Sequence, residues 1–152
     1  MRTVQDIIDT KPRASNFIRS DKLVIEALNY LNAVNLSYLI VMDDGVFKGI
    51  FSERDYTRNL ALKGRSSATT TVGEIMTADL PKVVLADSVE HCMNEMTTRK
   101  TRYLLAYDGN KFVGVITIHD LLRQVIASKE DVFDRALTKK LIDNDESSER
   151  IY

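Results

Sequence analysis

Two short segments of the chain place a hydroxyl residue three positions before an aspartate. The first pair is Ser52 and Asp55, and the second is Thr117 and Asp120. Free backbone amides at a helix start attract phosphate, and a hydroxyl there can bond a phosphate or ribose oxygen. The carboxylate offers acceptor oxygens suited to the vicinal hydroxyls of a ribose. These four residues are therefore the first candidates for contacts to a nucleotide.

The same spacing also has a purely structural interpretation. In a capping box, the hydroxyl accepts a hydrogen bond from an amide in the first helical turn, and the acid accepts one from the amide of the capping residue. For a single isolated copy this interpretation is favoured, because the pattern is common at helix starts. The two interpretations are compatible, since one geometry serves both.

Basic residues near these segments are secondary candidates. Arg54, Arg58 and Arg123 follow the hydroxyl residues, and an arginine pairs with phosphate through its planar fork. For each of them an exposed or ion-paired surface role is an equal alternative, although Arg58 and Arg123 occupy the same place in the two segments. His119 could contact a phosphate when protonated, but a surface role is the favoured interpretation.

The sequence contains no pattern typical of an enzyme. It has no P-loop, no HExxH segment and no recognisable set of nucleophile, base and orienting group. The single cysteine, Cys92, excludes an intrachain disulfide and every metal site built from several cysteines. It aligns with Ala27 on an apolar helix face, which indicates a small buried residue. We expect a chain that is not an enzyme and requires neither a metal nor a cofactor.

An internal repeat with an offset of 65 residues, as from Asp55 to Asp120, positions the two segments alike. Apolar residues at helical spacing begin at Val24 and Val89, and Asp-Gly and Gly-Asn turns mark a hairpin in each copy. Each copy is expected to run strand, helix, strand, hairpin, strand, helix. The hairpin strands are expected at 38–42 with 46–51 and at 103–107 with 111–116, and the closing helices at 55–62 and 120–128.

The repeat divides the chain into residues 1–65, 66–128 and an extension, 129–152. A unit of about 60 residues buries little surface alone, so we expect two units packed face to face around a shared core. Apolar residues in the extension keep helical spacing from Val132 to Leu141. This predicts a helix that either packs on its own domain or forms a dimer contact, followed by a frayed polar segment at 144–150.

Composition limits the partners of the chain. Its 152 residues carry a formal net charge of −1, so no overall field favours nucleic acid or an anionic membrane. No apolar run reaches the roughly 18–20 residues that a membrane span needs, and the N-terminus lacks the apolar core of a signal peptide. Hydrophobic residues make up 44% and charged residues 28% of the chain, as in soluble globular proteins. We expect a cytoplasmic protein.

The ordered set of features resembles the CBS domain, the module named after cystathionine β-synthase. Each copy has a Thr-Val start, an amphipathic helix, a strand ending in Asp, a Gly turn and a closing Gly-x-x-Ser/Thr-x-x-Asp segment. The resemblance extends from Thr3 to Ala127 and includes two copies, the usual CBS pair or Bateman module. Residues 52–56 and 63–67 are similar to those of small stand-alone bacterial CBS-pair proteins. The chain departs from the family where Ile40 and Leu105 replace a common strand proline.

The resemblance implies a fold and a class of ligand. The fold would be α/β, with two βαββα units related by pseudo-twofold symmetry and two clefts between them. The ligands would be chiefly AMP, ADP or ATP, with S-adenosylmethionine or NAD as alternatives. The chain would act as a regulatory module, form a homodimer and signal to an effector protein that the sequence does not identify. A structural dimerisation or interaction domain without a small ligand is the competing hypothesis.

By the same resemblance, Asp55 and Asp120 would hold ribose hydroxyls, and Ser52 and Thr117 would contact ribose or phosphate. Arg102 stands where related adenylate sensors place a basic residue on phosphate, whereas its counterpart at position 37 is a neutral serine. The two clefts are therefore expected to differ, with phosphate preferring the one that Arg102 reaches.

Overall fold

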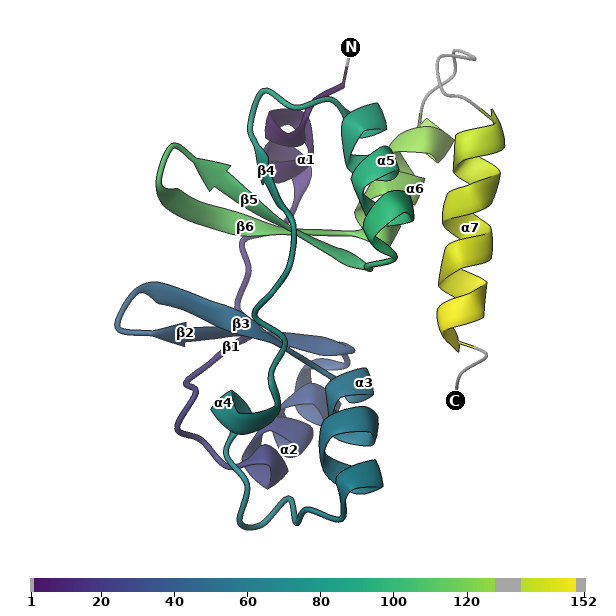
Figure 1. Ribbon diagram of the computed structural model, residues 1–152. Helices are drawn as coiled ribbons and strands as arrows, with labels where there is room; N and C mark the ends of the chain where they lie inside the picture. The colour runs from purple at the N-terminus through teal and green to yellow at the C-terminus, as the bar shows by residue number, and fades with distance from the viewer. Residues whose placement is uncertain (1, 128–134, 150–152) are drawn as a thin grey trace. The chain divides into compact units, whose positions relative to one another are not determined.

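The computed structural model describes residues 2–127 and 135–149, which belong to two compact units (Figure 1). The first-sheet unit is Arg13–Asp79. The second-sheet unit combines Met1–Pro12 with Leu80–Tyr152. The units therefore do not follow the repeat boundaries at 65 and 128, because the N-terminal segment packs with the second sheet.

The first-sheet unit contains a three-stranded sheet with the order β1-β2-β3. β1 runs parallel to β2, and β2 runs antiparallel to β3. The elements of this unit are β1 (Phe17–Ile18), α2 (Val24–Val34), β2 (Tyr38–Asp43), β3 (Val46–Ser52), α3 (Glu53–Asp55), the helical turns η1 (Tyr56–Leu60) and η2 (Ala61–Lys63), and α4 (Val72–Ile75).

The second-sheet unit repeats this arrangement with the strand order β4-β5-β6. Its first two strands are again parallel and its last two antiparallel. The elements are α1 (Val4–Thr10), β4 (Lys82–Val84), α5 (Val89–Arg99), β5 (Tyr103–Asp108), β6 (Lys111–Thr117), α6 (Ile118–Ala127) and α7 (Arg135–Glu149). The prediction of a mixed α/β fold with two βαββα repeats is confirmed, whereas their face-to-face pseudo-twofold packing stays a prediction.

The repeat extends to the register of the strands. In the first hairpin Val41 pairs with Gly49, and the register then shifts; in the second, Ala106 pairs with Gly114 before the same shift. A side chain at Gly49 would lie 2.8 Å from the carbonyl oxygen of Thr77, which is closer than real contacts allow. This glycine therefore lets the segment after α4 approach the sheet.

The short helices α1 and α4 start with the repeated Thr-Val pairs. The amide of Thr3 donates to Asp6 Oδ2 at 2.9 Å, and the amide of Thr71 donates to Glu74 Oε2 at 2.8 Å. Each pair forms a capping box that begins its helix. The apolar faces of α1 and α4 then enter different cores, α1 that of the second-sheet unit and α4 that of the first.

The closing helices of the two repeats differ in form. α6 is regular over ten residues, whereas the expected helix at 55–62 is a short α-helical turn followed by a π-helical turn and a 3-10 turn. This helical stretch ends at Gly64, which adopts φ 68°, a left-handed conformation that glycine tolerates without strain.

The C-terminal helix α7 lies beside α5 and α6 (Figure 1). Leu141 is fully buried in the core of the second-sheet unit. The interpretation as a helix packed on its own domain is therefore confirmed, while Val132, where the predicted helical spacing begins, lies outside the described residues. The polar segment from residue 144 belongs to α7, which continues to Glu149, and its fraying stays a prediction.

Candidate functional site

Both hydroxyl–aspartate pairs lie where the last strand of a sheet turns into a helix. Ser52 ends β3 directly before α3, and Thr117 ends β6 directly before α6. The two hydroxyl residues also share a register position, opposite Tyr38 and Tyr103 on the neighbouring strands. The repeat thus gives two chemically similar positions, which we call the Asp55 site and the Asp120 site.

At the Asp55 site the capping box is complete. The amide of Ser52 donates to Asp55 Oδ2 at 2.8 Å, and the Ser52 hydroxyl donates to the same oxygen at 3.0 Å. In return, the Asp55 amide donates to Ser52 Oγ at 3.3 Å. The structural interpretation is therefore correct here, and it fixes the carboxylate at the end of the strand.

A further neutral donor contacts Asp55 from the segment after α4. The hydroxyl of Thr77 donates to Asp55 Oδ1 at 2.6 Å, while the Thr77 backbone exchanges hydrogen bonds of 2.8 and 2.9 Å with Ile50. Burial raises the pKa of the Asp55 carboxyl above its ordinary value, and the hydrogen bonds from Thr77 and Ser52 only partly offset this effect. The Asp55 site, formed by Ser52, Asp55 and Thr77, therefore presents a buried carboxylate held by neutral donors.

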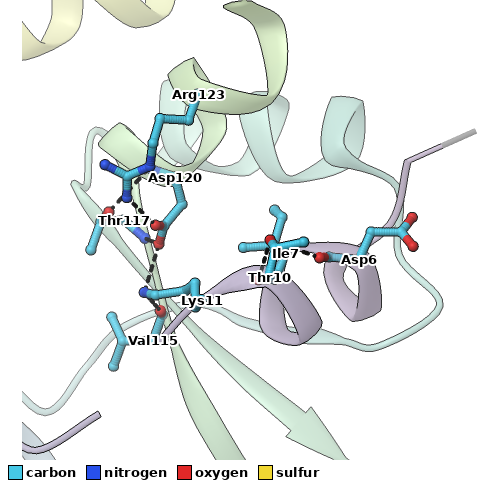
Figure 2. A network of polar contacts seen from close by, with 8 residues as sticks. All are labelled: Asp6, Ile7, Thr10, Lys11, Val115, Thr117, Asp120 and Arg123. Atoms are coloured by element: carbon cyan, nitrogen blue, oxygen red, sulfur yellow. Dashed lines mark hydrogen bonds and ion pairs between the residues drawn. The ribbon is translucent and has the colours of Figure 1, made fainter. Parts of the chain in front are cut away.

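At the Asp120 site the same box is surrounded by cations (Figure 2). The amide of Thr117 donates to Asp120 Oδ2 at 2.8 Å, and the Asp120 amide donates to Thr117 Oγ1 at 3.2 Å. Lys11 Nζ donates to Asp120 Oδ2 at 2.8 Å, and Arg123 Nη2 donates to Asp120 Oδ1 at 2.6 Å. The Asp120 site thus consists of Thr117, Asp120, Lys11 and Arg123.

The cations reverse the effect of burial on Asp120. Burial alone raises the pKa of this carboxyl, but the charge and hydrogen bond of Lys11, with the Thr117 amide and Arg123, outweigh it. The pKa of Asp120 consequently lies below its ordinary value, whereas that of Asp55 lies above it. The two aspartates have matching positions in the repeat and opposite pKa shifts.

The other predicted residues are distributed around these sites. Arg102 lies beside the Asp120 site, because its carbonyl oxygen accepts from the amide of Ile118 at 3.2 Å; Ser37 accepts from the Glu53 amide in the same way. Arg54 is half-buried beside Asp55, and its charge partly opposes the rise that burial causes in the pKa of that carboxyl. Arg58 and His119 are exposed.

Sequence reasoning missed Thr77 and Lys11. Both follow one of the short helices, but these helices differ in length, with seven residues in α1 and four in α4. The repeat therefore does not align Lys11 with Thr77, and no pattern identified them as partners of the aspartates. A useful signal would have been the Thr-Val starts, which mark segments that pack beside the Gly–hydroxyl–Asp strands.

A metal site and a membrane-spanning helix are both absent from the described residues. Over residues 2–127 and 135–149, no group of three or more His, Cys, Asp or Glu side chains is placed to hold a metal ion. Within the same part of the chain, the helices are too short or too polar to cross a membrane.

Comparison with known proteins supports the pattern of repeats. The family described as "CBS domain" matches residues 4–62 and 72–127. The CBS domain-containing protein CBSX3, mitochondrial, of Arabidopsis thaliana is 28% identical over 142 residues, which cover 88% of this chain and 69% of that protein.

Solved structures resemble this one over most of its length. A putative signal-transduction protein with CBS domains from Burkholderia ambifaria MC40-6 is 36% identical with a TM-score of 0.77, and the match covers 87% of this chain and 99% of that one. CBSX2, solved in complex with AMP, is 24% identical with a TM-score of 0.70, covering 86% of this chain and 100% of that one. At that identity the second likeness shows the fold alone.

Proposed function

This chain belongs to the CBS-domain family, and from that premise we propose that it is a regulatory module that binds AMP, ADP or ATP without catalysing a reaction. The observation that carries the proposal is the Asp55 site. A buried carboxylate with a raised pKa, held by the hydroxyls of Ser52 and Thr77, is an acceptor for the vicinal hydroxyls of a ribose. A protein of the same fold, CBSX2, was solved in complex with AMP.

The neutral donors matter for nucleotide binding because ribose hydroxyls can replace them on the carboxylate. A hydroxyl that donates to Asp55 can rotate and accept a hydrogen bond from an incoming ribose hydroxyl, so the carboxylate can change partners without losing an ion pair. Arg54, Arg58, Arg102, Arg123 and His119 remain the proposed phosphate contacts, and S-adenosylmethionine or NAD remains an alternative ligand.

The proposal that the chain is not an enzyme agrees with the state of its single thiol, which is unsuited to nucleophilic catalysis. Cys92 is buried, and burial raises the pKa of its thiol to about 12. At neutral pH the thiol is therefore protonated, and the thiolate that nucleophilic catalysis requires is absent.

We propose that the signal passes through a homodimer or to an effector protein, and that the protein is cytoplasmic. Such a signal is limited by the difference in affinity of the nucleotide for the two states of the module.

One observation favours a second candidate function, a structural interaction domain without a small ligand. Both hydroxyl–aspartate pairs form hydrogen-bonded helix caps, and caps alone would account for these residues. The aspartates would then only stabilise the helix starts.

A thermal-shift panel separates the two functions. AMP, ADP, ATP, NAD and S-adenosylmethionine are each added to nucleotide-free protein. A ligand at about 100 times its dissociation constant adds roughly 2.7 kcal/mol, or about 5 to 11 °C for a chain of this size. Asp55→Ala should lose the shift while keeping the fold. If no compound shifts the melting temperature, the structural interaction domain is the better account.

A further inference from the structure

Lys11 is fixed over the Asp120 carboxylate by the way α1 ends. The Thr10 hydroxyl donates to the carbonyl oxygens of Asp6 and Ile7 at 3.0 and 3.1 Å, and the Lys11 amide donates to the Ile7 carbonyl at 3.0 Å. The Lys11 backbone then leaves the helix in an extended conformation. Figure 2 shows its side chain reaching from α1 toward the end of β6, where the ammonium meets Asp120.

The ammonium has two acceptors. Lys11 Nζ donates to Asp120 Oδ2 and to the Val115 carbonyl oxygen, both at 2.8 Å. Val115 matches Ile50 in the repeat, and Ile50 is the residue whose backbone pairs with Thr77. Lys11 therefore joins Asp120 to the strand beside it, as Thr77 joins Asp55 to its strand, but Lys11 contacts Oδ2 of its aspartate and Thr77 contacts Oδ1.

The two aspartates differ in what a ribose would have to displace. A carboxylate has about four lone-pair positions, and the hydrogen bonds described above occupy three on each aspartate. At Asp55 the side-chain donors are hydroxyls, which can rotate to accept from a new partner. At Asp120 the side-chain donors are an ammonium and a guanidinium, which have no acceptor to offer and would lose an ion pair.

We infer that Lys11 closes the Asp120 site to ribose hydroxyls and so directs the nucleotide to the Asp55 site. The inference rests on the proposed function and adds a residue that decides which of two similar sites is used. Both aspartates are buried, Asp55 at 6% and Asp120 at 3% exposed, so the difference between the sites lies in the donors on each carboxylate. Lys11 acts as a specificity determinant by occupying Oδ2 of Asp120, while the exposed Arg123 side chain contacts Oδ1.

The test is the stoichiometry of AMP binding, measured by isothermal titration calorimetry on the full chain. Wild-type protein should bind one AMP per chain, and Lys11→Met should bind a second. Lys11→Arg, which keeps a cation at this position, should keep the wild-type stoichiometry. Lys11→Gln is the second neutral variant and retains a donor for the Val115 carbonyl, so the test stands if the methionine variant does not fold.

A double variant shows where the second AMP binds. Asp55→Ala should bind no AMP, whereas Asp55→Ala with Lys11→Met should bind one at the Asp120 site. Far-UV circular dichroism and thermal unfolding establish that each variant is folded.

Three results would overturn the inference and leave the proposed function intact. They are two AMP molecules per wild-type chain, a neutral Lys11 variant that still binds one, and a neutral variant that binds none because Lys11 is itself a nucleotide ligand. A wild-type chain that binds no nucleotide would instead remove the proposed function and the inference with it.

Discussion

The contrast between the two aspartates predicts opposite responses to the same substitution. Asp55→Asn and Asp120→Asn each replace a carboxylate by an amide of the same shape. At Asp55 the amide can be accommodated, because its oxygen can accept from Ser52 and its NH₂ group can donate to the Thr77 hydroxyl after that hydroxyl rotates. At Asp120 the NH₂ group must face Arg123 or Lys11, and both of these are donors.

The size of each change in the free energy of unfolding follows from the groups that contact the aspartate. Hydrogen bonds to charged groups contribute about 1.5–3 kcal/mol, against about 1 for neutral ones. The Arg123 side chain is 68% exposed, so its ion pair with Asp120 counts as a surface pair of about 0–1 kcal/mol, and most of the loss comes from Lys11. We expect Asp120→Asn to lower the free energy of unfolding by about 1–3 kcal/mol, and Asp55→Asn to change it by less than about 1 kcal/mol.

The pH dependence has opposite signs at the two positions. The pKa of Asp120 is lowered in the fold, so its contribution is present above the unfolded value of 3.8 and is lost as the pH falls through the folded value. The pKa of Asp55 is raised, so its contribution is present below 3.8 and is lost as the pH rises through the folded value. The difference in the free energy of unfolding between wild type and Asp120→Asn should therefore become smaller in acid.

Urea titrations followed by far-UV circular dichroism measure both effects. Wild type and the two asparagine variants are compared at neutral pH and at several values below pH 4. The reasoning is refuted if Asp55→Asn is as destabilising as Asp120→Asn at neutral pH, or if the cost of Asp120→Asn persists unchanged in acid.

Three other predictions concern phosphate recognition, close packing and the C-terminal helix. In the double variant Asp55→Ala with Lys11→Met, whose one AMP lies at the Asp120 site, Arg102→Ala should weaken AMP binding more than adenosine binding in calorimetry, and equal losses would show that Arg102 does not contact phosphate. Gly49→Ala should destabilise the fold by about 1–3 kcal/mol, since its Cβ would lie 2.8 Å from the Thr77 carbonyl; Gly114→Ala, which meets only a flexible side-chain end at 3.2 Å, should cost less in the same urea titration. Leu141→Ala should cost about 2–5 kcal/mol, and a negligible change in unfolding would contradict the packing of α7.

Much of each repeat could be predicted from its sequence because the relevant forces are local. The apolar spacing after Val24 and Val89 gave the helices α2 and α5, and the turn residues gave both hairpins within a residue or two. The hydroxyl–aspartate pairs were placed correctly at the ends of β3 and β6, since strand end and helix cap are both encoded within a few residues.

The features that the sequence did not predict depend on contacts between segments that are distant in the chain. Lys11 and Asp120 are 109 positions apart, and Thr77 and Asp55 are 22 apart. The packing of the N-terminal helix on the second sheet is also non-local, so the repeat boundary at residue 65 could not indicate it. Local spacing equally gave no sign of the π-helical turn at Tyr56–Leu60, which has no counterpart in α6.

The most direct test of nucleotide binding is a calorimetric titration of AMP into nucleotide-free wild-type protein and into Asp55→Ala. The account predicts saturable binding to wild type and no binding to a folded Asp55→Ala variant, because the variant lacks the carboxylate that accepts the ribose hydroxyls. Binding of AMP to Asp55→Ala with unchanged affinity, or no binding to wild type, would contradict it.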